Sequence, residues 1–207
     1  MTQKIRPESA FATAAWAYLN RLQSCFSEAN LAAIGILAKA LRQAWIEGRN
    51  VYICGNGGSA ANAIHLANDL HYGIGACGPG AKLPGLRVEA LPANAGIITC
   101  IANDTGYDNI YSNQLEVKGR KGDLLIVLSG SGNSPNVVRA LETSNKMGIN
   151  SFAVLAFSGG RCRELADTTI YFDIKDMQVA EDTQLIVGHM CMQWLNREKP
   201  TELIPLD

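Results

Sequence analysis

Five short apolar runs, separated by segments with helical spacing, constrain the fold of this 207-residue chain most strongly. Strands that alternate with helices along a chain form a parallel sheet with helices on both faces. The predicted strands are residues 51–54, 86–90, 124–128, 152–156 and 169–172, and the predicted helices are residues 60–72, 95–103, 135–147, 161–166 and 180–196. The pattern therefore predicts an α/β fold, a three-layer αβα sandwich around a five-stranded parallel sheet.

The chain before the first strand has the spacing of two helices. Residues 8–48 contain no proline, and apolar residues recur there every three or four positions, with a break near residues 27–30. We predict a helical hairpin over residues 8–48, an α/β core over residues 49–196 and a single domain over residues 1–207. Because apolar side chains lie on more than one face of the hairpin, it packs either against another subunit or on the core of its own domain.

Composition argues against several kinds of partner and location. Charged residues make up 18% of the chain and its net charge is −1, so no basic excess points to nucleic acid. The six cysteines show neither a CxxC pair nor the spacing of a secreted domain. No apolar signal segment begins the chain, and no run is apolar enough to cross a bilayer. We expect a cytoplasmic protein with reduced thiols, no nucleic acid partner and no membrane, and a flexible glycine-rich loop over residues 73–85.

A glycine-rich turn follows the first predicted strand. Residues 55–59 read Gly-Asn-Gly-Gly-Ser, and we expect Ser59 to be the N-cap of the following helix. Such a turn presents backbone N–H groups beside the positive end of a helix dipole, which suits a phosphate or a polar sugar. The run matches neither the dinucleotide fingerprint nor the P-loop, so alone it leaves a ligand site and an ordinary strand-to-helix turn equally open.

A second turn of this kind follows the third predicted strand. Residues 129–136 read Ser-Gly-Ser-Gly-Asn-Ser-Pro-Asn, and Pro135 suits the first position of a helix. Three serines above a helix N-terminus can surround phosphate oxygens with hydroxyl and amide donors, whereas capping the helix would need only one hydroxyl. Both turns follow the carboxyl ends of strands, where ligands bind in such sheets. The second turn therefore predicts an uncharged phosphate site.

Four segments of the sequence together resemble the sugar isomerase (SIS) domain. They are residues 55–59, residues 101–104 with Tyr107, residues 121–123 and residues 129–136. The likeness extends from the N-terminal helices to about Leu195, and within the family it points to the phosphoheptose isomerases. It implies a flavodoxin-like SIS fold, a homotetramer, and a phosphosugar aldose–ketose isomerase in heptose biosynthesis. The implied reaction converts sedoheptulose 7-phosphate to D-glycero-D-manno-heptose 7-phosphate through an enediol with metal assistance.

The resemblance also implies a zinc site. Phosphoheptose isomerases hold zinc with a His and a Glu on the helix after the first turn and with a Gln and a His on the last helix. The matching positions here are His65, Asp69, Glu181 and His189, and two histidines with two carboxylates remain suitable for zinc. Read without the family, His65 and Asp69 at i, i+4 spacing more often form a hydrogen bond than a metal site.

Glu181 and His189 would lie about 12 Å apart along an unbroken helix. One ion could join them if both side chains reach inward or if the ligands come from different subunits. We therefore predict a site at or near a subunit boundary, and a local break in the last helix is the competing explanation.

Catalytic and binding roles follow from the same resemblance. Asp69 is expected to act as the base that moves a proton between C1 and C2, with His189 as the proton partner. Without the family context, Asn103 and Asp104 would be only a turn-forming pair. The expected substrate contacts are Asn56, Gly57, Gly58, Ser59, Asp69, Asn103, Asp104, Ser129, Gly130, Ser131, Ser134 and Glu181.

A function without catalysis is the alternative. Asp at position 69 and Glu at position 181 depart from the family pattern, and some SIS relatives bind phosphosugars yet act through protein contacts. The chain would then be a phosphosugar sensor, or an adaptor for the bacterial replication initiator.

Overall fold

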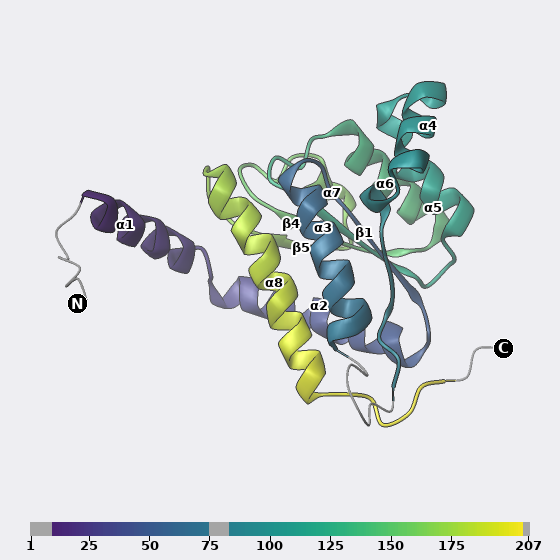
Figure 1. Ribbon diagram of the computed structural model, residues 1–207, viewed down its shortest axis with the longest axis horizontal. Helices are drawn as coiled ribbons and strands as arrows, with labels where there is room; N and C mark the ends of the chain where they lie inside the picture. The colour runs from purple at the N-terminus through teal and green to yellow at the C-terminus, as the bar shows by residue number, and fades with distance from the viewer. Residues whose placement is uncertain (1–9, 75–82, 205–207) are drawn as a thin grey trace, which may run out of the picture.

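The computed structural model describes residues 10–74 and 83–204 and forms an α/β sandwich of three layers (Figure 1). One sheet holds five parallel strands in the order β2-β1-β3-β4-β5, which is the flavodoxin-like order. The strands are β1 (Asn50–Cys54), β2 (Arg87–Ala90), β3 (Leu124–Ser129), β4 (Asn150–Leu155) and β5 (Thr168–Tyr171). All five predicted strands are confirmed, and so is the predicted fold class.

Both faces of the sheet are apolar because helices cover both. In β3 all six residues are buried, and alternate side chains point to opposite faces. Ile126 packs in a core cluster with residues of α2 (Glu28–Ile46), α3 (Gly58–Asn68) and α8 (Met177–Arg197). Val127 packs in a second cluster with residues of α5 (Ser112–Lys118) and α6 (Pro135–Met147). The N-terminal ends of α3 and α8 consequently lie on the same face, near the carboxyl edge of the sheet.

The five predicted helices of the α/β core are confirmed, and one further helix was missed. The helices are α1 (Ala10–Ser24), α2 (Glu28–Ile46), α3 (Gly58–Asn68), α4 (Ala95–Thr105), α5 (Ser112–Lys118), α6 (Pro135–Met147), α7 (Cys162–Leu165) and α8 (Met177–Arg197), with a π-helical turn η1 (Asp69–Gly73) and 3-10 turns η2 (Leu91–Ala93) and η3 (Tyr107–Asn109). The missed helix, α5, is seven residues long and buries one apolar side chain, Leu115, so it carries no periodic signal.

The two N-terminal helices form as predicted, and they meet at a bend rather than folding back on each other. Their axes bend by 67° at the break, and α1 runs outward from the body of the molecule (Figure 1). A capping box of Ser27 and Asn30 begins α2, which buries seven residues on the domain's own core, while α1 buries none. Tyr18 and Arg21 tie α1 to α8, through a hydrogen bond to Asp182 and an ion pair with Asp176 at 3.4 Å.

In the described ranges, no single helix is both long and apolar enough to cross a bilayer, and only the bent pair of α1 and α2 would qualify, on length and composition alone. Most of the loop predicted over residues 73–85 lies outside the described residues, so its flexibility stays a prediction.

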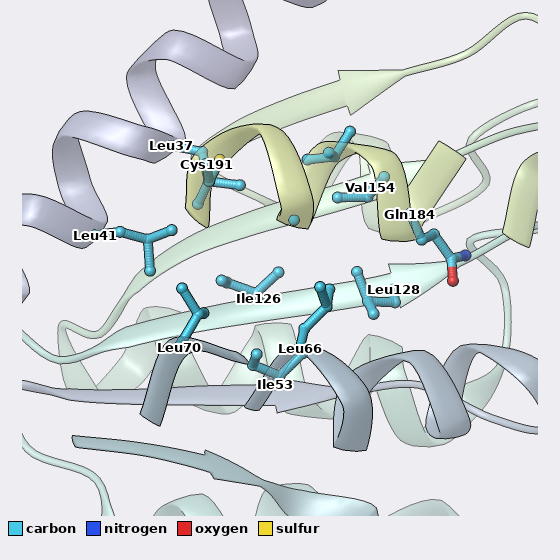
Figure 2. Close-up of a pocket in the computed structure, with 12 residues that line it drawn as sticks. Leu37, Leu41, Ile53, Leu66, Leu70, Ile126, Leu128, Val154, Gln184 and Cys191 are labelled. Atoms are coloured by element: carbon cyan, nitrogen blue, oxygen red, sulfur yellow. The ribbon is translucent and has the colours of Figure 1, made fainter. Parts of the chain in front are cut away.

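A small apolar cavity of about 20 Å³ lies between α2, α3, α8 and the sheet (Figure 2). Leu66, Gly188 and Cys191 are among the residues that line it, and Gln184 is its one polar side chain. An apolar void of this size stays dry, because a buried water needs two or more polar partners. The cavity lies beside the close contact between Leu66 on α3 and Gly188 on α8.

Candidate functional site

The two glycine-serine turns lie next to each other because they follow neighbouring strands. β1 and β3 pair in parallel with Cys54 opposite Val127, and each turn begins one or two residues later. A cavity of about 290 Å³ opens between the turns and the start of α8. The residues that line it are Asn56, Gly57, Gly58, Ser59, Leu128, Ser129, Gly130, Ser131, Ser134, Met177 and Glu181. Nine of the twelve expected substrate contacts thus come together, and Asp69, Asn103 and Asp104 do not line this cavity.

The first turn enters its helix earlier than the sequence predicts. The N-cap of α3 is Gly57, whose φ of 55° lies in the left-handed region that glycine tolerates, and no side chain caps the helix. Ser59 is a buried residue of the first helical turn, so its prediction as N-cap is wrong. The first N–H groups of a helix have no intrahelical partner. They are donors available at the cavity wall.

The second turn arranges its hydroxyls around a tight loop. The Ser129 Oγ accepts a hydrogen bond from the Gly132 N–H at 3.0 Å, and the Ser131 Oγ accepts one from the Asn133 N–H at 3.4 Å. Ser134 is the N-cap of α6 and makes no capping bond with its side chain. Each hydroxyl can still donate its own proton to a ligand. The turn therefore offers O–H and N–H donors with no positive side chain.

A pair of asparagines links the two turns. Asn56 and Asn136 exchange two amide hydrogen bonds of 2.8 Å, and the Tyr107 hydroxyl donates to the Asn56 Oδ1 at 3.1 Å. The Tyr111 hydroxyl donates to the Gly55 carbonyl, and burial raises the pKa of this phenol well above its usual range. The sequence alone predicts no role for Asn136 or Tyr111. Asn136 belongs to the second motif, but its partner is 80 residues away, so only the fold reveals the pairing.

The first two turns of α8 form the third wall of the cavity. Met177 lies against Gly130, and the Glu181 carboxylate lies against Gly58, where a Cβ on either glycine would come closer than 3.0 Å to the α8 side chain. Asn62 of α3 donates to the Glu181 backbone carbonyl at 2.9 Å, which fixes α8 on α3. The close approach explains why glycine occupies both positions.

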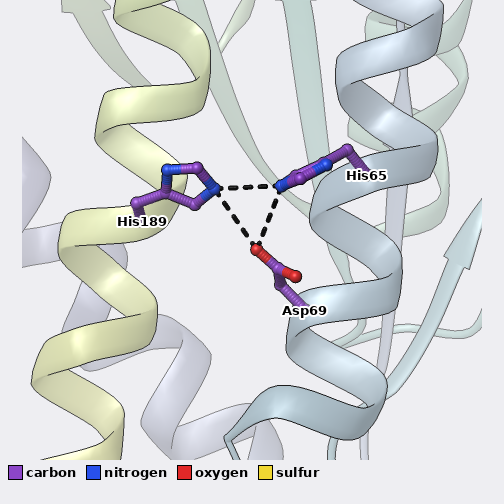
Figure 3. Close-up of side chains that lie close together, drawn as sticks. All are labelled: His65, Asp69 and His189. Carbon is purple, nitrogen blue, oxygen red and sulfur yellow. Dashed lines mark hydrogen bonds and ion pairs between the residues drawn. The ribbon is translucent and has the colours of Figure 1, made fainter. Parts of the chain in front are cut away.

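Further along the same two helices, His65, Asp69 and His189 converge (Figure 3). The two Nε2 atoms lie 3.0 Å apart, and each lies 3.3 Å from the Asp69 Oδ2. A tetrahedral zinc site with bonds of about 2.0–2.1 Å needs ligand atoms about 3.3 Å apart. The three side chains therefore have the donor types and the spacing for zinc, and a fourth position remains for water or substrate.

Glu181 does not join this group. It lies two helical turns nearer the start of α8, at the third wall of the cavity, and it is absent from the one cluster of metal-ligating side chains found among the described residues. The helix is continuous over Met177–Arg197, so the expected local break does not occur. A contribution of Glu181 to a metal across a subunit boundary stays a prediction.

Asn103 and Asp104 lie elsewhere in this chain. Both are exposed near the end of α4, where the Asn103 Nδ2 donates to the Asp104 Oδ1 at 2.8 Å. They belong to neither the cavity nor the metal-ligating group of this chain, so their contact with substrate stays a prediction.

Comparison with known proteins agrees with these motifs. Residues 16–156 match the SIS domain. A phosphoheptose isomerase of Chlorobaculum parvum is 36% identical over 179 residues, which cover 85% of this chain and 83% of that protein. The structure of a phosphoheptose isomerase from Neisseria gonorrhoeae superposes with a TM-score of 0.81 and 24% identity, covering 90% of this chain and 97% of that one. The structure of a phosphoheptose isomerase from Francisella tularensis superposes with a TM-score of 0.82 and 21% identity, covering 93% of this chain and 100% of that one. At these identities the structural likeness shows the fold alone. The chain belongs to the SIS domain family.

Proposed function

We propose that the chain is a phosphosugar isomerase that interconverts sedoheptulose 7-phosphate and D-glycero-D-manno-heptose 7-phosphate. The observation that carries this proposal is the pairing of an uncharged donor-lined cavity with a metal-ligating group along the same two helices. The same reaction is supported by the name of a relative that is 36% identical to this chain, a phosphoheptose isomerase.

The phosphate would bind at the second turn. Ser129, Ser131 and Ser134 offer hydroxyl donors, and the start of α6 adds the positive end of its dipole. None of the described residues that line the cavity is a lysine or an arginine. Binding there depends on hydrogen bonds and the helix dipole rather than on an ion pair.

The distance from the cavity to the metal-ligating group suits a long sugar. Gly58 faces Glu181, and His65, seven residues further along α3, faces His189, so α3 and α8 run side by side in the same direction (Figure 1). Seven residues of helix span about 11 Å. A chain of seven carbons, with six C–C bonds of about 1.5 Å, extends about 8 Å before its phosphate is added. A heptose phosphate is therefore similar in length to the helical span between the cavity wall at Gly58 and the metal-ligating group.

The reaction chemistry would lie at His65, Asp69 and His189. Zinc bound by these three side chains would supply a Lewis acid that polarises the substrate's carbonyl and hydroxyl oxygens. Asp69 would take the proton from C1 of the ketose and return it to C2 of the enediol, and His189 would carry the proton between the two oxygens. The Asp69 Oδ2 faces both imidazoles, and its Oδ1 accepts from the Asn68 amide at 3.4 Å.

The active assembly is proposed to be a homotetramer with sites near subunit boundaries. α1 buries none of its own residues and exposes Phe11 and Trp16 to 80% and 66%. An apolar groove of about 220 Å³ between α2 and α8, which Leu31, Met190 and Trp194 line, offers a second contact surface. The free thiols of Cys25, Cys54, Cys100, Cys162 and Cys191 fit a reducing cytoplasm.

The proposal is tested by incubating the protein with sedoheptulose 7-phosphate, with and without added zinc, and measuring aldose formation. We expect turnover that zinc raises and a chelator removes. Asp69→Asn should lower kcat by at least about a hundredfold and leave phosphate binding intact. His189→Gln should lower the zinc content of the purified protein, while His71→Gln, a matched exposed histidine outside the group, should leave it unchanged. Sugar phosphate binding without any turnover would favour the sensor or adaptor function instead.

A further inference from the structure

We propose that Glu181 is a specificity residue that binds sugar hydroxyls and repels inorganic phosphate. The cavity would then accept a phosphate group when it is attached to a sugar and disfavour the free anion. This inference rests on the proposed function, because it takes the cavity to be the phosphosugar site.

The Glu181 carboxylate is placed to accept hydrogen bonds from a ligand in the cavity. Glu181 lines the same cavity as Ser129, Ser131 and Ser134, and its carboxylate lies against Gly58 at the start of α3. Its side-chain oxygens make no hydrogen bond or ion pair among the described residues. The cavity thus combines phosphate donors at the second turn with an acceptor that has unused lone pairs at the start of α3.

Among the described residues, the lining of the cavity carries one negative charge and no positive charge. Glu181 is the one charged side chain among the described residues of this cavity, and no cation beside it offsets its charge. The carboxylate is stabilised instead by the positive end of the α3 dipole, which a second anion would otherwise use. A free phosphate in the cavity would therefore meet a like charge and gain nothing from that wall.

A sugar phosphate would gain from the same wall. Sugar hydroxyls are donors, and a carboxylate can accept several hydrogen bonds, each stronger than one to a neutral acceptor. The attraction between Glu181 and the hydroxyls would exceed the repulsion of the phosphate, which is held at the second turn. The cavity would then discriminate a sugar phosphate from free phosphate, because the Glu181 charge attracts the sugar hydroxyls and repels the phosphate group.

The test uses calorimetry to measure the affinities of three variants for inorganic phosphate and for sedoheptulose 7-phosphate. In Glu181→Gln, inorganic phosphate should bind several-fold tighter because the repulsion is gone, and sedoheptulose 7-phosphate should bind about tenfold weaker because a charged acceptor is lost. Glu181→Asp keeps the charge but shortens the side chain, so it should still reject phosphate and should bind the sugar phosphate weakly. Glu116→Gln, which removes a charge from the exposed face of α5, should leave both affinities unchanged.

Opposite shifts in Glu181→Gln are the decisive result, since a merely structural role would move both affinities in the same direction. The same signs are expected for protein as purified and after dialysis against a chelator, which separates this role from metal binding. If the wild-type protein binds sedoheptulose 7-phosphate but Glu181→Gln shifts both ligands alike or neither, this inference is overturned while the proposed function stands. If the wild-type protein does not bind the sugar phosphate, the proposed function and this inference both fall.

Discussion

A single methyl group added at Gly188 should wedge α3 away from α8. A Cβ there would come closer than 3.0 Å to three atoms of the Leu66 side chain, and Leu66 is only 5% exposed. Overpacking a core costs about 1–3 kcal/mol. The cavity of about 20 Å³ beside both residues can take up part of the displaced side chain, so we expect the lower half of that range, about 1–2 kcal/mol.

Gly35→Ala is the matched control, since Gly35 also lies inside a helix and no atom lies within 4 Å of an added Cβ. Both substitutions gain about 1 kcal/mol from the helix propensity of alanine. The difference between their unfolding free energies therefore isolates the overpacking. Urea titrations followed by circular dichroism measure both values by linear extrapolation.

A second background sharpens the test. Leu66→Ala removes the atoms that the new methyl group would meet, so the overpacking cost of Gly188→Ala should disappear in that background. Zinc affinity gives an independent readout, because His65 and His189 are the chain neighbours of the two packed residues and their Nε2 atoms lie 3.0 Å apart. Equal unfolding free energies for Gly188→Ala and Gly35→Ala, or the same cost with Leu66→Ala present, would refute the packing argument.

Other perturbations test separate parts of the structure. Gly132→Ala places a side chain at a φ of 67° and closer than 3.0 Å to a carbonyl oxygen, so calorimetry should find sugar phosphate binding at least about tenfold weaker. Gly106→Ala is the control, because it strains the backbone at a φ of 98° but has open space around the added Cβ. Burial raises the pKa of Cys191 to about 12 and that of Tyr52 to about 12, so these groups hold their protons to higher pH in the folded chain than in the unfolded chain. The unfolding free energy should therefore be unaffected by them below about pH 9 and fall as the pH rises from about 9 to 12, which urea titrations at several pH values will measure. At pH 8 an alkylating reagent should modify the exposed Cys100 and spare Cys191, as read by mass spectrometry of the folded protein.

The layered fold was predictable because its signals are local. A fully buried strand such as β3 appears as an uninterrupted apolar run, and Pro135 marks the start of α6 at the residue where the structure places it. The angle between α1 and α2 left no such signal, because it depends on what each helix packs against. α5 was missed for a related reason, since tertiary contacts rather than sequence period hold a seven-residue helix in place.

The candidate site was predictable only in part. Spacing alone placed His65 and Asp69 on one helical face, and family likeness supplied His189 as the third member of the group. The position of Glu181 against Gly58 depends on how closely α8 approaches α3, which no local pattern encodes. The Asn56–Asn136 pair was invisible for the same reason, since two loops far apart in the chain meet only once the sheet has formed.

The last helix has a consequence for how the protein becomes active during synthesis. α8 supplies one wall of the cavity and one histidine of the metal-ligating group, and it also covers a face of the sheet with Val187 and Leu195. A nascent chain that has not yet released α8 from the ribosome lacks both the binding site and the cover for that apolar face. Substrate or metal can therefore stabilise only a chain that has been synthesised through α8, and a chain that terminates before α8 would present an uncovered sheet to chaperones and proteases.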